Sequence, residues 1–514
     1  MEEKKQIKAG VILQYLQMAL QLIINLIYTP IMLRILGSVE YGIYNLSASI
    51  VSYLNLLTLG FGASYIRFYS RYKSKNDDNG IKKMNGLYLI TFIAMGIVAL
   101  IAGGVLAKNI NIFYNDTYTS QNIETARWLM ILLTINLAIS FPASVFTSYI
   151  TSQEKFIFEK TINIGKTVLS PFLTIVALYL GYGSIGMALV TTIISLLVDS
   201  CNVIYCFKKL NMQFSFKNLS KSLLKEIAVF SLFIALNQII DQINWQTDKV
   251  ILGKMANGTA VAVYAVGSNI NTMYISLSTA ISSVFTPKIY KIVNENKSNM
   301  NNELTELFIK VGRVQYFALM LALTGFIFFG KYFISKWAGE GYKLSYYVAL
   351  LLICPVTVPL CQNIGIEIQR AKNKHQFRSI VYAFMAILNV IISIILCRYY
   401  SVIGVALGTT ISLIVANLII MNIYYQKKIG INVIKFWKSI FMTIPSLIIP
   451  CIAGTLLMKY VKINNIIEFV ELAILYGAIY FISVYCMGLN DYEKNLIRKP
   501  LAKLKGRKEE KSNG

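Results

Sequence analysis

Polar side chains recur at helical spacing near the start of the chain, inside a run that is otherwise apolar. Gln14, Gln17, Gln21 and Asn25 follow one another at intervals of three or four residues, which places them on one face of an α-helix. Each of these amides can both donate and accept hydrogen bonds. Such a face is suited to water, to another polar helix or to a substrate that offers hydrogen-bonding groups.

A second polar face occurs in residues 236–250, LNQIIDQINWQTDKV. Here Gln238, Asp241, Gln242 and either Asp248 or Lys249 share one side of a helix, while the isoleucines take other directions. A further polar set in residues 42–66 comprises Asn45, Ser49, Ser52 and Asn55. These three sets are the main candidates for a binding surface.

Ionisable side chains within apolar runs are candidate functional residues, because a charge in hydrocarbon is costly. Asp241 is a candidate for a proton-linked or cation-linked carboxylate, and the alternative is a hydrogen-bonded structural role. Arg67, Lys166 and Arg313 are candidates for binding an anionic substrate group. The alternative for these basic residues is snorkelling of their charged ends to the membrane interface. Asp199 also lies within an apolar run.

Motifs typical of enzymes give little basis for a catalytic function. The single histidine, His375, lies in a basic loop, and the seven cysteines lie in apolar runs without metal-ligand spacing. Gly181, Gly183 and Gly186 fit G-x-G-x-x-G, but an apolar helix precedes them instead of a strand, so they predict a hairpin turn. The GKT at 165–167 lacks the leading glycine of a P-loop. The sequence predicts no cofactor, no metal and no catalytic residues.

The composition is that of a chain folded in lipid. Of 514 residues, 56% are hydrophobic and only 14% are charged, whereas a soluble domain has about 25% charged residues. The mean hydropathy is +0.58, and apolar runs of about 20 residues, enough to cross a bilayer, recur throughout. The first run, 11–36, is too long for a signal peptide and no cleavage site follows it. These features predict an all-α integral membrane protein.

The apolar runs predict fourteen transmembrane helices joined by short connections. They lie at 10–32, 42–66, 85–107, 127–150, 161–180, 185–207, 226–248, 259–285, 312–335, 345–368, 379–398, 402–425, 439–459 and 465–487.

Basic residues define an orientation for these helices. The net charge is +25, and most of the 49 Lys and Arg residues fall in the N-terminal tail and in every second connection. Lys and Arg are retained on the cytoplasmic side, so both termini are predicted to be cytoplasmic. The positive charge is therefore mainly a topology signal with some attraction to anionic lipid headgroups, and we expect no nucleic-acid partner.

An internal repeat divides the chain. SIGMALVTTIISLL (184–197) resembles VIGVALGTTISLIV (402–415), and ILGSVEYGIYNLSASI (35–50) resembles ILGKMANGTAVAVYAVGSNI (251–270). Two copies of a six-helix unit explain both matches, and an even number of helices relates them by an axis along the membrane normal. The predicted domains are two pseudo-symmetric lobes at 1–220 and 221–438, two further helices at 439–490, and a basic cytoplasmic tail at 491–514.

In this repeat the seventh span corresponds to the first, and both carry a polar face. Lipid offers no hydrogen-bond partners, so the two faces are predicted to meet across a hydrated cavity. The alternative is that they hold packed helices together, at about 1 kcal/mol for each interhelical contact.

The chain resembles the polysaccharide transporter family, the O-antigen and capsule repeat-unit flippases. This family belongs to the multidrug/oligosaccharidyl-lipid/polysaccharide exporter superfamily, which also contains multidrug (MATE) extruders and lipid II flippases. The resemblance rests on LGSVEYGIYNLSASIVSYLNLLTLGFGASYIRFYS (36–70) and TDKVILGKMANGTAVAVYAVG (247–267), and it covers essentially the whole chain. It implies a MATE-like fold and a transporter in the bacterial cell membrane.

The resemblance also implies a substrate. It would be an undecaprenyl-diphosphate-linked oligosaccharide, moved from the inner to the outer leaflet by alternating access, with membrane lipid and a polysaccharide polymerase as expected partners. The first alternative is an ion-coupled multidrug or cation extruder of the same superfamily, and the second is a membrane polysaccharide polymerase.

One departure from the lipid II flippases bears on the diphosphate. Those flippases carry arginines along the first helix, where this chain has Gln14, Gln17 and Gln21. The diphosphate contacts are therefore left to Arg67, Lys166 or Arg313. Asp241 is the candidate for ion coupling. The candidates for the cavity wall are the residues of the two polar faces, Gln14, Gln17, Gln21, Asn25, Gln238, Asp241 and Gln242.

Overall fold

Helices are the only regular elements among the residues that the structure, a computed structural model, describes, namely 2–58, 60–217, 220–295, 298–495 and 498. Most of the predicted basic tail, 491–514, lies outside these residues. The architecture is therefore all-helical, as predicted.

Nine helical segments of the described residues are long and apolar enough to cross a membrane, or ten if α15 (Val433–Phe441) and α16 (Pro445–Tyr460) form one bent span. Two of them, Ala9–Thr58 and Gln376–Ile429, contain a residue with non-helical backbone angles, at Gly37 and Ser401. Each of these two segments covers two predicted spans. The chain is a multi-pass membrane protein, and the total of fourteen spans stays a prediction.

The chain forms two compact units, each built from two separate stretches of the sequence. The first comprises described residues of 1–266 and 382–409, and the second comprises those of 267–381 and 410–514. The predicted lobes at 1–220 and 221–438 stay a prediction.

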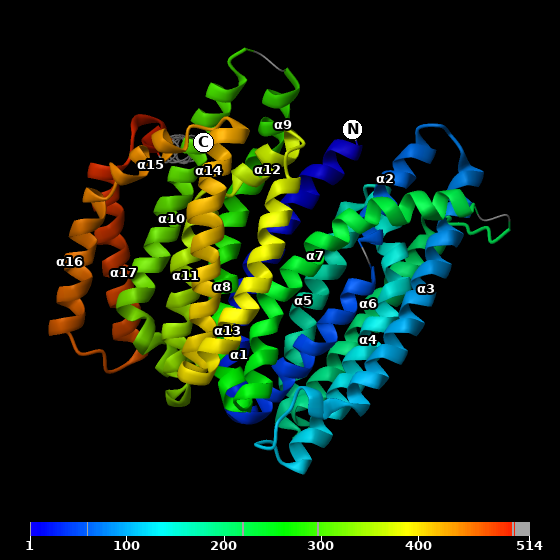
Figure 1. Ribbon diagram of the computed structural model, residues 1–514, viewed down its shortest axis with the longest axis horizontal. Helices are drawn as coiled ribbons and strands as arrows, with labels where there is room; N and C mark the ends of the chain where they lie inside the picture. Colours follow the sequence, from blue (N-terminus) through cyan, green and yellow to red (C-terminus); the bar gives the residue numbers. More distant parts are fainter. Residues whose placement is uncertain (1, 59, 218–219, 296–297, 496–497, 499–514) are drawn as a thin grey trace, which may run out of the picture. The chain divides into compact units, whose positions relative to one another are not determined.

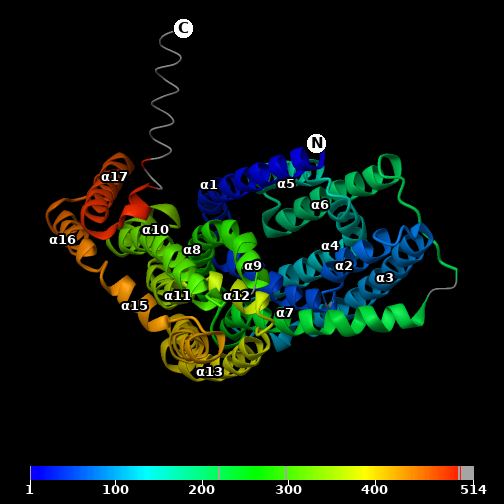
Figure 2. The ribbon, with the colours of Figure 1, turned by 90° about the horizontal axis from the view of Figure 1, so that it is seen from above.

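The first unit contains most of the N-terminal helices. They are α1 (Glu2–Ser52), the 3₁₀ turn η1 (Tyr53–Thr58), α2 (Phe61–Lys73), α3 (Asp78–Lys108), η2 (Ile110–Ile112), α4 (Ser120–Ser152), α5 (Phe156–Tyr179), α6 (Gly183–Lys208), α7 (Lys221–Met255), the start of α8 (Gly258–Ser282) and much of α13 (Gln376–Leu413). Figures 1 and 2 both show α3 and α4 side by side.

Aromatic side chains fill the core of this first unit. Tyr65, Phe68 and Tyr88 are buried in one cluster with residues of α2, α3, α4 and α6. The buried hydroxyl of Tyr65 donates to Asn85 Oδ1 at 2.6 Å. Because its hydroxyl is paired inside the unit, the Tyr65 ring is buried without leaving an unsatisfied hydrogen-bond donor.

The two segments that share the LG-x-x-x-x-G pattern contact each other within the first unit. A Cβ added to Gly42 would lie 1.8 Å from the Gly258 carbonyl oxygen, and one added to Gly253 would lie 2.3 Å from a Leu46 methyl group. The Ser38 and Thr259 hydroxyls are 3.3 Å apart. Glycine is therefore required at position 42 for the backbone approach, and the repeated motif is a helix-packing element.

The second unit is built around the long helix α10 (Met300–Trp337). Its other elements are the rest of α8 and α13, η3 (Ser283–Phe285), α9 (Thr286–Glu295), η4 (Glu340–Tyr342), α11 (Leu344–Cys361), α12 (Ile364–Ala371), the π-helical segments η5 (Ile414–Met421) and η6 (Tyr425–Ile429), α14 (Asn422–Tyr424), α15 (Val433–Phe441), α16 (Pro445–Tyr460), α17 (Ile466–Ser483) and η7 (Val484–Gly488). α16 and α17 lie side by side (Figures 1 and 2).

Candidate functional site

The second predicted span, 42–66, is not one continuous α-helix. α1 ends at Ser52, the 3₁₀ turn η1 follows, and Gly60 adopts a left-handed conformation (φ 71°) before α2 begins at Phe61. The Ser52 hydroxyl donates to the Ser49 carbonyl at 2.6 Å. Irregular backbone at membrane depth occurs where it is buried in protein or lines a cavity, and a 3₁₀ stretch within a helix often marks a hinge.

A cavity of about 330 Å³ adjoins this break, entirely within the first unit. Five elements contribute to its wall. The lining residues are Ala48, Val51 and Ser52 of α1, Asn55 of η1, Leu133, Asn136, Leu137 and Ser140 of α4, Lys166 of α5, and Ser195 and Asp199 of α6. Its volume falls near the lower end of the roughly 300–1,000 Å³ found for ligand sites.

Lys166 supplies the positive charge of this cavity. Its Nζ donates to the Ser195 hydroxyl at 3.1 Å, and its ammonium interacts electrostatically with the Asp199 carboxylate. Ser195 and Asp199 are four residues apart, so they share one face of α6. The Lys166 ammonium is therefore held in the cavity wall by partners inside the unit.

Amides and hydroxyls supply the rest of the polar wall. Asn136 and Ser140 lie one turn apart on α4, and Ser52 and Asn55 flank the start of the 3₁₀ turn. These groups can donate to and accept from a sugar hydroxyl or a phosphate oxygen. One cation, one carboxylate and several neutral hydrogen-bonding groups thus meet in a small volume.

The polar face formed by Gln14, Gln17, Gln21 and Asn25 lies elsewhere on α1. The Gln21 amide donates to Asn25 Oδ1 at 3.0 Å on an exposed face, and Gln14 and Gln17 are half-buried. None of these four residues lines the 330 Å³ cavity. Their assignment to a substrate path stays a prediction.

The polar face of α7 is partly occupied by contacts with α1 and η1. The Gln242 amide donates to the Ser52 hydroxyl, the Ser49 hydroxyl donates to Gln246 Oε1 at 3.0 Å, and the hydroxyls of Tyr53 and Thr247 are 2.6 Å apart. These residues hold two helices together, which is the alternative that the sequence left open. Gln238 and Asp241, on the same helix, are exposed.

The two candidate arginines have different surroundings. The Arg67 guanidinium is exposed and lies 4.3 Å from the centre of the Phe230 ring, a cation–π contact between α2 and α7. One turn further, Arg71 pairs with Glu226 at 2.8 Å. Arg67 is therefore accessible, but it does not line the cavity.

Arg313 lies in the second unit and is buried. Its Nε and Nη2 donate to the two oxygens of Glu493 at 2.6 and 2.9 Å, and its Nη atoms also donate to the carbonyls of Ser439 and Gly488 at 2.9 and 2.8 Å. The bidentate pair ties α10 to the residues after the last span, and the two carbonyl contacts tie it to α15 and to the end of that span. Because the donors are engaged, we do not carry Arg313 into the proposed site.

Asn136 and Ser140 are cavity residues that the sequence reasoning missed. Their spacing of four within the apolar run 127–150 was the available signal. The sequence did identify Asp199 as an ionisable residue at membrane depth and Asn55 as part of a polar set, without bringing either to Lys166. Contact between α1, α4, α5 and α6 is long-range and cannot be read from spacing.

A second polar cluster surrounds Asp248, which is buried. Its Oδ2 accepts from the hydroxyls of Tyr264 and of Thr409, the latter at 2.7 Å. Asn389 Oδ1 lies 3.4 Å from the Thr409 hydroxyl. The neighbouring Lys249 donates to Gln246 at 3.3 Å. The buried carboxylate is thus stabilised by hydroxyl donors within the first unit.

Comparison with known proteins places the chain in a family. Residues 7–293, more than half of the sequence, match the family model described as polysaccharide biosynthesis protein. The chain belongs to this family. The match, with the fold similarities below, confirms the resemblance to the polysaccharide exporters of the superfamily. No curated protein sequence matches the chain.

Solved structures with the same fold are transporters. A lipid II flippase, MurJ, in an inward-closed conformation aligns with a TM-score of 0.70 at 15% identity, covering 95% of this chain and 99% of that chain. An inward-facing multidrug MATE transporter aligns with a TM-score of 0.60 at 15% identity, covering 80% and 94%. An outward-facing multidrug MATE transporter aligns with a TM-score of 0.55 at 16% identity, covering 82% and 95%. These similarities confirm the MATE-like fold.

Proposed function

We propose that this polysaccharide biosynthesis protein is a flippase and not an enzyme. It would move an undecaprenyl-diphosphate-linked oligosaccharide from the inner to the outer leaflet of the bacterial cytoplasmic membrane, with both termini in the cytoplasm. The exported unit would serve the assembly of capsule, O-antigen or another surface polysaccharide, next to a polymerase. The observation that carries the proposal is the polar cavity around Lys166 inside a membrane-spanning unit.

The chemistry of this cavity matches part of such a substrate. A diphosphate requires a cation, which Lys166 supplies, and sugar hydroxyls require amides and hydroxyls, which Asn55, Asn136 and Ser140 supply. A volume of about 330 Å³ accommodates a diphosphate with an adjoining sugar and leaves the rest of the glycan outside the cavity. The polyprenyl chain would stay in lipid.

The irregular backbone next to the cavity gives a place for movement. α1 and α2 are separated by the 3₁₀ turn η1 and by Gly60, so the two helices can change their mutual angle without breaking a continuous hydrogen-bond ladder. Such bending accompanies alternating access in transporters with broken helices. Ser52 and Asn55 lie at this point and would move with it.

Ion coupling is assigned to Asp241 as a proposal. Its carboxylate is exposed on α7, and Gln238 and Gln242 flank it. We also propose that the exposed Arg67 and the polar face of α1 that carries Gln14, Gln17, Gln21 and Asn25 contact the glycan outside the 330 Å³ cavity.

The competing function is a multidrug or cation extruder of the same superfamily. A cationic substrate requires a cavity with a net negative charge, whereas Lys166 balances Asp199 here. The cavity therefore lacks the net negative charge that a cationic substrate requires.

The test is a leaflet-resolved assay in proteoliposomes that contain a fluorescent undecaprenyl-diphosphate-linked oligosaccharide. The wild-type chain is expected to expose the glycan to an external glycosidase, and Asp241→Asn is expected to abolish stimulation by an ion gradient while leaving binding intact. A chain that exports cationic dyes and leaves the glycan in its original leaflet would show that the extruder is correct.

A further inference from the structure

The short helix α15 has two faces of different kinds. On one face Val433, Phe436 and Ile440 are buried, and the Phe436 ring lies 4.8 Å from that of Phe308 on α10. On the other face Ile434 is 73% exposed and Phe441 is 59% exposed. α15 is followed by a bend of 45° before α16 begins. A short amphipathic helix next to a bent span is typical of the membrane interface.

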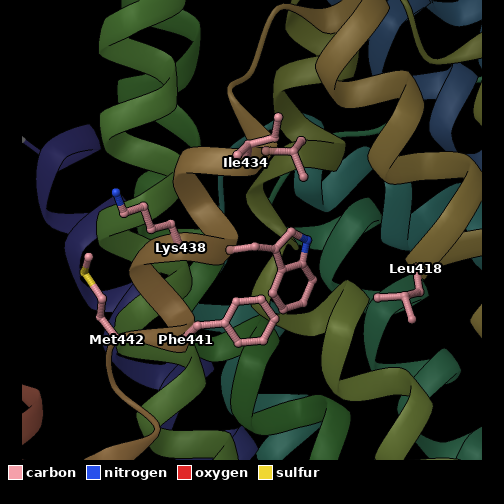
Figure 3. A pocket seen from close by; sticks show the side chains of 7 residues that line it. Leu418, Ile434, Lys438, Phe441 and Met442 are labelled. Atoms are coloured by element: carbon pink, nitrogen blue, oxygen red, sulfur yellow. The ribbon is translucent and has the colours of Figure 1, made fainter.

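The exposed face of α15 forms one wall of an apolar groove, with η5 as the other wall. The groove has a volume of about 700 Å³ and is lined by Leu418, Val433, Ile434, Trp437, Lys438, Phe441 and Met442. Figure 3 shows Phe441 extending toward Leu418, while Lys438 leaves α15 on the opposite flank. In a membrane, a groove of this composition is filled by hydrocarbon and not by water.

The indole of Trp437 is held in a fixed position. Its Nε1 donates to Asn422 Oδ1 at 2.9 Å, which pairs its only polar atom. The ring is therefore a rigid apolar surface of the groove. Tryptophan with a satisfied N–H is typical of the headgroup level of a bilayer.

Lys438 lines this groove, and three further lysines lie near it in the sequence. Lys438 is exposed, and in the part of the chain that the structure describes its ammonium has no ion-pair or hydrogen-bond partner. Lys435 pairs with Glu306, and Lys427 and Lys428 lie in η6 just before α15. Four lysines between residues 427 and 438, next to a membrane helix, are the pattern that attracts anionic headgroups. This segment is on the predicted cytoplasmic side.

We propose that the groove between η5 and α15 binds an anionic glycerophospholipid. One acyl chain lies along Leu418, Ile434 and Phe441, and the headgroup phosphate is paired with the Lys438 ammonium. The lysine stem covers the apolar rim while its charged end reaches the headgroups. The proposal does not depend on the transported substrate, because the groove lies outside the cavity around Lys166.

The test is native mass spectrometry of the full-length protein from nanodiscs that contain equal amounts of phosphatidylglycerol and phosphatidylcholine. The wild-type chain is expected to retain phosphatidylglycerol preferentially. Lys438→Gln is expected to lower its retention about fivefold, the effect of one lysine near a membrane surface. Leu418→Trp fills the groove and is expected to lower it while leaving Lys438 in place. Lys459→Gln, at the far end of α16, is the matched control and is expected to change nothing.

A second readout locates the lipid. The chain has four tryptophans, so the readout is a difference between lipids. Brominated phosphatidylglycerol is expected to quench the fluorescence more strongly than brominated phosphatidylcholine, and Trp437→Phe should remove that difference. Equal retention of the two lipids, or unchanged retention in Lys438→Gln, would overturn the proposal. A competition with undecaprenyl phosphate gives a further outcome. If this lipid displaces phosphatidylglycerol equally well from the wild-type chain and from Lys438→Gln, the proposal is overturned, since the groove would then be a polyprenyl site. A dimer that Leu418→Trp disrupts would assign the groove to a second copy of the chain.

Discussion

The substitution Lys166→Gln isolates the charge at the centre of the proposed site. Glutamine can still hydrogen-bond to the Ser195 hydroxyl, which Lys166 contacts at 3.1 Å, so the substitution removes the positive charge and keeps a polar group. A hydrogen bond between an ionised donor and an anion contributes about 1.5–3 kcal/mol. Because Lys166 is only half-buried and glutamine keeps part of the contact, we expect the lower value, an increase in Kd of roughly tenfold.

The assay measures binding of an undecaprenyl-diphosphate-linked oligosaccharide to the protein in nanodiscs, followed by leaflet-resolved transport. Lys166→Arg should keep most of the affinity because it keeps the charge. Lys208→Ala, exposed in the last turn of α6, is the control for loss of a basic residue outside the cavity. Kd and transport rates equal to those of the wild type in Lys166→Gln, with unchanged thermal stability, would refute the assignment of the cavity to the diphosphate.

Three further predictions follow from the described contacts. Asp199→Asn removes the carboxylate that competes for Lys166, so the substrate should bind a few-fold more tightly and dissociate more slowly, as measured by stopped-flow release. Gly42→Ala places a Cβ 1.8 Å from a backbone carbonyl oxygen and should cost about 1–3 kcal/mol or more by overpacking, whereas Gly104→Ala, with open space around it, should leave the thermal midpoint unchanged. Arg313→Met alone should destabilise the protein by about 3–5 kcal/mol because it leaves the Glu493 carboxylate buried and unpaired, and Glu493→Leu in the same chain should restore part of that loss in thermal unfolding.

Periodicity predicted the helical architecture well because each membrane helix satisfies its own backbone hydrogen bonds. It could not locate the break after Ser52, since the 3₁₀ turn η1 is as apolar as a helix. It did place a connection at each of the other two breaks, because Gly37 and Ser401, the non-helical residues inside α1 and α13, fall in the predicted connections 33–41 and 399–401. The break after Ser52 depends on tertiary contacts and not on local composition.

The candidate site was predictable only in part. Lys166 and Asn55 were identified individually as polar groups at membrane depth, but nothing in the sequence indicated that η1, α4, α5 and α6 meet around one cavity. Gln242 illustrates the difficulty, because its spacing suits a cavity while its amide is used to hold Ser52. A polar face can line a cavity or hold packed helices together, and only the observed packing of α7 on α1 shows which role a given residue has.

Ser52 contributes both to the cavity wall and to the contact between α1 and α7. It lines the cavity around Lys166, and its hydroxyl accepts the amide of Gln242, the residue next to Asp241. Any occupant that displaces Ser52 must therefore stretch or break its bond to α7, the helix that carries the exposed carboxylate. In the proposed flippase, substrate binding in the pocket and the environment of the Asp241 carboxylate would therefore be linked through one serine.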